Sequence, residues 1–248
     1  MLLGHEPRGA VGRRGLGGRT LRALRALSTV LIVSGSLLIA DAGLTLLWQE
    51  PISALIAKFN QRALAGQLND LENLTQLQLR ALSRLHSEQR RIAFLARAER
   101  RRVKTGDAIG RIKIKRMKIN FVVVEGTDTA SLQKGPGHYP DTAFPGLPGT
   151  VAIAGHRTTY LAPFRKLNEM RNGDEIELDM PYAQLTYRTY LHKIVDPSAY
   201  DLVTKRKPFD RVVLTACHPL YSARKRIAVF ARLVDVRPRG KARVPARL

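Results

Sequence analysis

Apolar residues run almost without interruption from residue 26 to residue 48, where "ALSTVLIVSGSLLIADAGLTLLW" contains a single charged residue, Asp41. About 20 helical residues are enough to cross the hydrocarbon core of a bilayer. Arginines precede this run, so the positive-inside rule places the basic residues 1–25 in the cytoplasm and everything after Trp48 outside the cell. The pattern therefore predicts a single-pass protein of the cell membrane, with residues 26–48 as its anchor and Trp48 at the interface.

A cleaved signal peptide is the alternative interpretation of the same run. Ala40, Asp41 and Ala42 match the small-x-small pattern of a cleavage site that follows an apolar core. The apolar sequence continues past this site to Trp48, which favours the retained anchor. Both interpretations export the rest of the chain.

Residues 49–105 have the composition of a helix, rich in Ala, Leu, Gln and Arg and without proline after Pro51. Apolar residues recur along one heptad seam of this region, which the polar residues Thr75, Gln78 and Gln89 interrupt. Its apolar members are Leu64, Leu68, Leu71, Leu82, Leu85 and Ile92. The pattern predicts a helical stalk, about 75 Å long if residues 52 to about 102 form one continuous helix at 1.5 Å per residue. Weak self-association through this stalk would follow.

From Gly106 the pattern changes to short apolar or alternating runs separated by loops rich in glycine and proline, and it continues to about residue 236. The runs include "IGRIKIKRMKINFVVVEG", "TVAIAGH", "LTYRTYLHKIV", "RVVLTAC" and "RIAVFARLVDV", each typical of strands. Seven or eight short strands with few helices predict a mainly β domain, a closed barrel of antiparallel type. Residues 106–236 form this domain, and residues 237–248 form a basic C-terminal tail.

The net charge of +22 raises nucleic-acid binding as a function class. The basic residues gather before the apolar run, at the end of the helical region and in the tail. Residues 106–236 lack the alternation of aromatic and basic residues on which bases stack. Export also argues against this class, so no nucleic-acid partner is expected. The basic ends are expected to contact an anionic membrane or wall polymer, or to keep the protein soluble.

The chain contains one cysteine, Cys217. A lone thiol is a small buried hydrophobe, a metal ligand or a nucleophile. Zinc needs several ligands in tetrahedral spacing, and the candidates beside the thiol are His138, His156 and His218. Because Cys217 and His218 are adjacent, they chelate awkwardly, so neither a metal nor another cofactor is expected. The thiol follows a strand and precedes a loop, a position that exposes a side chain.

Thiol catalysis needs a base beside the sulfur and a donor for the developing oxyanion. His156 ends the apolar strand "VAIAGH", and Arg226 opens "RIAVFA", which could run beside the strand of Cys217. Strand ends that meet at one rim of a barrel assemble a site on a rigid scaffold. Arg224 points the same way as Arg226 on a strand. Arg226 is preferred because it directly precedes the apolar run.

Three stretches in this order, "VAIAGHRTTY", "LTACHP" and "SARKRIAVFA", resemble the sortases, the cell-wall cysteine transpeptidases of Gram-positive bacteria. "GHRTTYLAPF" and "CHPLYSARKR" are most similar to the class E branch of high-GC actinobacteria. The resemblance covers about residues 106–236, and the predicted anchor agrees with it. It implies an eight-stranded sortase-type barrel with short helices.

The resemblance also implies roles. Cys217 would be the nucleophile, His156 the general acid and base, and Arg226 the residue that binds the oxyanion and the substrate. Such enzymes cleave a sorting-signal peptide between Thr and Gly, form a thioacyl intermediate and transfer it to an amine of a peptidoglycan precursor. In class E the preferred signal is LAXTG rather than LPXTG.

Substrate contacts are implied at Tyr160, Thr215, Ala216 and His218, and Tyr160 matches the position implicated in the LAXTG preference. The family often has Thr-Leu-x-Thr-Cys before the thiol, whereas this chain has "VLTAC", two hydroxyls fewer. The substrate preference is therefore less defined than the reaction.

A different class of protein, a membrane-anchored scaffold that binds peptides without catalysis, would account for the charge, the anchor and the helical region. It gives no reason for His156, Cys217 and Arg226 to match the family in order.

Overall fold

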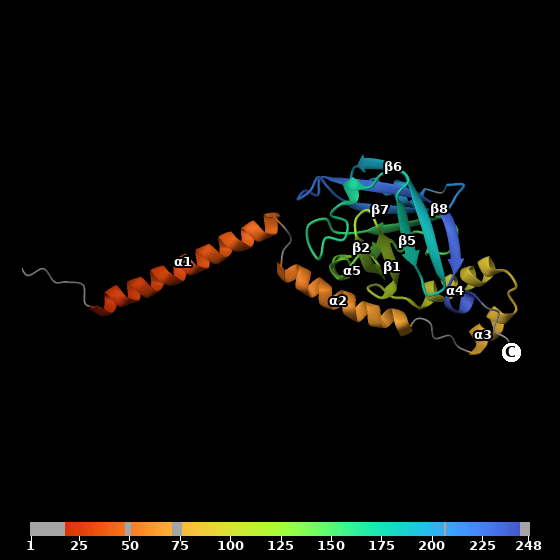
Figure 1. Cartoon of the computed structure of the whole chain (residues 1–248), viewed down its shortest axis with the longest axis horizontal. Helices are drawn as coiled ribbons and strands as arrows, with labels where there is room; N and C mark the ends of the chain where they lie inside the picture. Colours follow the sequence, from red (N-terminus) through yellow and green to blue (C-terminus); the bar gives the residue numbers. More distant parts are fainter. Residues whose placement is uncertain (1–17, 48–50, 71–75, 206, 244–248) are drawn as a thin grey trace, which may run out of the picture. The chain divides into compact units, whose positions relative to one another are not determined.

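The computed structural model describes residues 18–47, 51–70, 76–205 and 207–243 (Figure 1). They divide into two compact units, residues 1–48 and residues 49–248. Trp48, Leu71 and Thr75, which entered the sequence predictions, lie outside the described residues.

Helix α1 (Gly18–Leu47) is the described part of the first unit. Its window Thr20–Gly43 has a mean hydropathy of 1.9, and none of it is buried. By length and composition it is a candidate membrane span, although a signal sequence near an N-terminus has the same properties. The helix begins before residue 26, where the apolar run starts, because arginine and leucine continue a helix as readily as the apolar residues do.

The predicted stalk is helical, but it is three helices that belong to the barrel unit: α2 (Pro51–Asp70), α3 (Gln76–Ser83) and α4 (Glu88–Arg102). This corrects the expectation of one extended helix. The seam residues Leu64, Leu82 and Ile92 are buried within this unit. Their side chains are therefore unavailable for a coiled coil with a second copy.

Helix α2 is fastened to the barrel by Gln61. The side-chain oxygen of Gln61 accepts from the Val122 N–H at 2.7 Å, and its amide group donates to the Val122 and Lys134 carbonyls at 3.0 and 2.8 Å. One amide side chain thus pairs with backbone groups as a neighbouring strand would.

The second unit contains a closed barrel of eight strands within its described residues (Figure 1). The strands are β1 (Ala108–Ile114), β2 (Ile119–Glu125), β3 (Gly137–His138), β4 (Thr150–Ala154), β5 (Glu175–Asp179), β6 (Ala183–Val195), β7 (Arg211–His218) and β8 (Lys225–Pro238). Their order around the barrel is β1-β2-β3-β4-β7-β8-β6-β5. The sequence predicts a barrel of antiparallel type. The pairs β2/β3 and β4/β7 are parallel, however, so the sheet is mixed.

Among the described residues, three short helical segments lie between the strands, and a fourth follows the last strand. They are α5 (Thr129–Lys134), the 3-10 turn η1 (Leu167–Glu169), α6 (Asp201–Thr204) and the 3-10 turn η2 (Gly240–Ala242). Residues 237–243 of the predicted tail belong to the fold, because Ala242 is buried and its carbonyl accepts from Arg91 Nε at 2.8 Å. Residues 244–248 lie outside the described part.

Successive residues of β7 face opposite sides of the sheet, as in any strand. Val212, Leu214 and Ala216 belong to the main hydrophobic cluster inside the barrel. Thr215 and Cys217 therefore face outward, on the same side as Val213, which belongs to a separate outer cluster. Chemistry at Cys217 would take place on the outer face of the barrel.

Candidate active site

His156 and Cys217 lie at the same rim of the barrel. In the parallel pair β4/β7, Ala154 is opposite Thr215, and the Gly155 N–H donates to the Thr215 carbonyl at 3.0 Å. His156 and Cys217 each stand two residues beyond that last register pair. The ends of two neighbouring strands thus bring together residues that are 61 positions apart in the sequence.

Arg226 faces Cys217 across the antiparallel pair β7/β8, where the two residues are register partners. Directly opposite residues in such a pair have Cβ atoms about 4.5–5.5 Å apart and lie on one face. Arg226 Nη1 donates to the Ala223 and Lys225 carbonyls at 2.8 and 3.1 Å. Arg224 precedes β8 and has no partner in this register.

The backbone beside His156 is held by Phe164. The Phe164 N–H donates to the His156 carbonyl at 3.0 Å, and the Phe164 ring lies against Gly155 so closely that a Cβ there would be 2.6 Å from Cδ2. Only glycine leaves room for this contact. The glycine before His156 therefore lets Phe164 pack closely enough to hold the His156 backbone.

The imidazole of His156 packs beside the Tyr160 ring, with 5.3 Å between ring centroids. Burial lowers the pKa of His156 below its usual value of 6.5. Its Nε2 is buried and has no hydrogen-bond partner among the described residues. A buried ring nitrogen without a hydrogen-bond partner is uncommon in a folded protein, and here it lies at the rim where β7 ends.

Arg157, directly after His156, is a feature of the site that the sequence predictions did not include. It is only 5% exposed, and its guanidinium donates to the Cys217 carbonyl at 3.2 Å, to the Arg165 carbonyl and to Asn168 Oδ1 at 2.7 Å. Burial lowers the Arg157 pKa, as does the charge of Arg165, whereas the charge of Cys217 raises it. A buried cation thus holds the backbone of Cys217 and ties the loop after β4 to the end of β7.

Thr215 shares the outer face with Cys217, and its hydroxyl lies 3.0 Å from the Tyr139 hydroxyl. Tyr139 in turn packs beside Tyr200, with 6.0 Å between centroids. Neither tyrosine was expected at the site. Both come from connections between strands, where the sequence has no periodicity that would show which way a side chain points.

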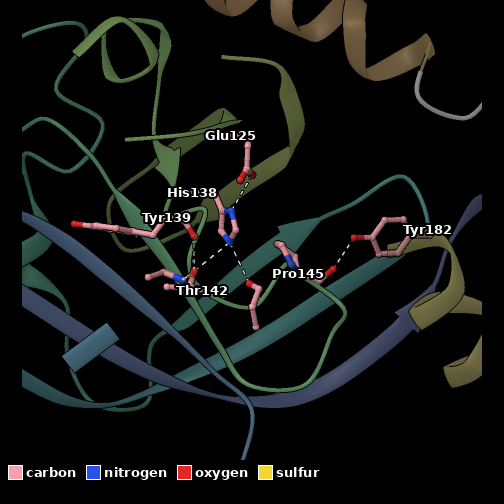
Figure 2. A network of polar contacts seen from close by, with 8 residues as sticks. Glu125, His138, Tyr139, Thr142, Pro145 and Tyr182 are labelled. Carbon is pink, nitrogen blue, oxygen red and sulfur yellow. Dashed lines mark hydrogen bonds and ion pairs between the residues drawn. The ribbon is translucent and has the colours of Figure 1, made fainter. Parts of the chain in front are cut away.

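A buried polar network holds the segment that carries Tyr139 (Figure 2). His138 Nδ1 lies 2.8 Å from Glu125 Oε2, and its Nε2 lies 3.1 Å from the Ala143 carbonyl. The Thr142 hydroxyl donates to the Tyr139 carbonyl at 2.7 Å. His138, considered above as a metal ligand, is thus paired with a carboxylate. Within the described ranges, no three His, Cys, Asp or Glu side chains gather to hold a metal ion.

The remaining predicted substrate contacts fall in different places. The Ala216 side chain points into the barrel interior, so it cannot touch a substrate on the outer face. His218 lies at the rim and lines, with Arg157, a cavity of about 370 Å³. Tyr160 lies against His156.

A family model described as the sortase domain matches residues 112–234, a range that includes His156, Cys217 and Arg226. The chain belongs to the sortase family. This confirms the resemblance noted in the sequence, and the closed barrel confirms the implied fold.

Similar proteins carry the names of two sortase classes. Sortase D of Bacillus subtilis (strain 168) is 34% identical over 133 residues, which cover 52% of this chain and 66% of that protein. Sortase SrtE1 of Streptomyces coelicolor is 28% identical over 156 residues, which cover 57% of this chain and 44% of that protein. This chain therefore matches from under half to about two thirds of the length of these curated relatives. Assignment to class E stays a prediction.

A solved sortase has the same fold. Sortase E1 from Streptomyces coelicolor, with a tripeptide in its active site, superimposes with a TM-score of 0.51 and 26% identity. The match covers 55% of this chain and 93% of that structure.

Proposed function

We propose that this sortase is a cysteine transpeptidase whose reacting groups are Cys217, His156 and Arg226. The observation that carries the proposal is the register of three neighbouring strands. The pairing of Cys217 with Arg226 and the meeting of the ends of β4 and β7 near His156 support the assignment of these three residues to one site.

The Cys217 thiolate attacks the carbonyl carbon of the scissile amide, and a tetrahedral intermediate forms with charge on the oxygen. Arg226 donates to this oxygen, since it projects from the position opposite the thiol. The C–N bond breaks as His156 gives its proton to the leaving amine, and a thioester remains on Cys217. An incoming amine then attacks the thioester carbon and loses a proton to His156, and the C–S bond breaks to restore the Cys217 thiolate beside a protonated His156.

The substrate is a sorting-signal peptide of the LAXTG or LPXTG type, cleaved between Thr and Gly, and the acceptor is an amine of a peptidoglycan precursor. Surface proteins would thereby become attached to the cell wall. The outward-facing Thr215 and Tyr139 support a peptide site along the outer face. The similar sortase E1 was solved with a tripeptide in its active site, which supports the same class of ligand.

Helix α1 would anchor the enzyme in the cell membrane, with the N-terminus in the cytoplasm and the catalytic domain outside. Its length and high mean hydropathy support this, and the arginines that precede residue 26 support the orientation.

The test compares the full chain in detergent micelles with Cys217→Ala, using a fluorogenic LAXTG peptide with and without an added amine. A fragment that starts at Gly106 is unsuitable, because it lacks the buried Leu64 and Ile92. We expect cleavage and an amine-linked product from the native chain only. Equal turnover by both proteins, or peptide binding without turnover, would favour the non-catalytic scaffold.

A further inference from the structure

Helix α2 has an apolar face that no other described part of its unit covers. Ile52, Leu55, Ile56 and Phe59 have the spacing i, i+3, i+4, i+7 of a stripe that usually packs into a core. Here these side chains are 73, 56, 49 and 61% exposed. An exposed apolar stripe of this kind usually marks an interaction surface.

The opposite side of α2 is already occupied. Ser53, Ala57 and Leu64 are buried against the barrel unit, and the Ser53 hydroxyl accepts from the Tyr160 N–H at 3.3 Å. At 3.6 residues per turn these positions lie roughly opposite the apolar stripe. The helix cannot turn the stripe inward without breaking the contacts of Gln61 and Ser53.

The sequence around the stripe indicates what covers it. Only residues 48–50 separate α2 from α1, the candidate membrane span. A chain that leaves a bilayer at the end of α1 therefore places the first turns of α2 near the lipid headgroups. The exposed Lys58 and Arg62 border one side of the stripe, and no acidic residue occurs between Pro51 and Asn69. Apolar side chains bordered by cations suit an anionic membrane surface.

We propose that the stripe Ile52, Leu55, Ile56 and Phe59 lies in the interface of an anionic bilayer. This rests on the membrane anchor proposed above. A second copy of the chain is the less favoured occupant, because Lys58 and Arg62 of two facing copies would repel. Since the other side of α2 holds Tyr160, next to His156, the bilayer would keep the His156 loop close to the membrane surface.

The test places single cysteines in the full chain, in which Cys217→Ser removes the native thiol. Ile56→Cys and Phe59→Cys report the stripe, Leu38→Cys reports α1, and Asn172→Cys, in an exposed turn, is the control. Each variant carries a polarity-sensitive fluorophore in vesicles of phosphatidylglycerol and phosphatidylethanolamine. Spin-labelled lipids should quench the labels at residues 56 and 59 about threefold more than the label at residue 172.

The outcomes separate the two proposals. In one outcome, spin-labelled lipid quenches the label at residue 38 but quenches those at residues 56 and 59 no more than the one at residue 172. The stripe is then in water, and this inference is overturned while the anchor stands. Residues 56 and 59 shielded from both lipid and aqueous iodide would mean a second copy, which also overturns it. If lipid does not quench residue 38, the anchor fails and the interfacial helix fails with it.

Discussion

The parallel pair β4/β7 has a buried arginine near each end, and the two do different things. Arg211 opens β7 and is 3% exposed; Arg157, which follows β4, is 5% exposed. Arg211 donates to Thr150 Oγ1 at 2.9 Å and to the Leu202 and Lys205 carbonyls at 2.8 and 3.2 Å. It also lies 5.4 Å from the centre of the Phe230 ring. Arg211 thus fastens α6 to the barrel.

Within the described chain, neither arginine forms an ion pair, and both are satisfied by neutral oxygens. Arg157 differs in what it fastens, because one of its acceptors is the Cys217 carbonyl. At one end of the strand pair the buried arginine holds α6, and at the other end it holds the backbone of the proposed nucleophile. The role of a buried charged side chain therefore has to be inferred from the groups that it contacts, because the two arginines are buried to a similar degree.

The largest effect is expected at the rim that carries Cys217. Arg226→Ala removes the donor opposite the thiol and should lower kcat about 100- to 1000-fold, the usual result of losing one oxyanion donor. Arg224→Ala is the matched control, since Arg224 is exposed and precedes the strand. It should keep most of the turnover of the fluorogenic peptide. The opposite ranking of the two variants would reject Arg226 as the oxyanion donor.

The next effect separates the two buried arginines. Arg157→Gln and Arg211→Gln each leave buried carbonyls without donors, so each should cost about 1–3 kcal/mol of stability. In thermal unfolding the two variants should lose similar amounts. The kcat/KM per folded molecule and the alkylation rate of Cys217 by iodoacetamide should fall only in Arg157→Gln. Equal loss of both readouts in Arg211→Gln would mean that the two arginines have one shared structural role.

The placement of Arg226 could be predicted from the sequence, whereas the role of Arg157 could not. Arg226 and Cys217 belong to strands joined by a short connection, so alternation along each strand fixes which residues share a face. Arg157 is one of 42 basic residues, and its acceptors at Arg165, Asn168 and Cys217 meet only after the chain folds. No local pattern marks a cation that is satisfied by distant carbonyls.

The helical region shows the same limit. A seam with Leu64, Leu82 and Ile92 predicts an apolar helix face, and such faces are present. Periodicity does not say what covers an apolar face. Here the barrel unit covers it, and not a helix of a second copy. Helix α2 contacts β1 and β2, and α4 contacts η2, all of which lie far from them in the sequence.

A smaller effect, on stability, is expected near the end of the barrel that Arg211 supports. Helix α4 lines a cavity of about 630 Å³ there, together with Gly149 and Asp210. Glu99 of α4 is buried, its Oε1 has no partner among the described residues, and burial raises its pKa from 4.5 to about 8. The folded state therefore keeps a proton that the unfolded state releases above 4.5, so this group lowers stability as the pH rises toward 8.

Glu99→Gln removes that titration without changing the shape of the side chain. The melting temperature of the variant relative to the native chain should rise by several degrees between about pH 5 and about pH 8. Differential scanning calorimetry at both values checks this. A difference that does not depend on pH would show that Glu99 is not protonated in the folded state.

The smallest effect concerns His156 at the opposite rim. Because the proposed reaction needs a thiolate and a protonated imidazole at the same time, the pH profile of kcat/KM should be bell-shaped. Because burial lowers the pKa of His156, the acid limb should lie below about 6.5. Tyr160→Ala exposes the imidazole, which should raise its pKa and move the acid limb up by a fraction of a pH unit.

Tyr160→Phe is the control, because it keeps the ring beside His156 and removes only the hydroxyl. Its acid limb should coincide with that of the native chain. If both variants moved the limb equally, the hydroxyl and not the covering ring would set the His156 pKa. If neither moved it, burial by Tyr160 would not be what lowers that pKa.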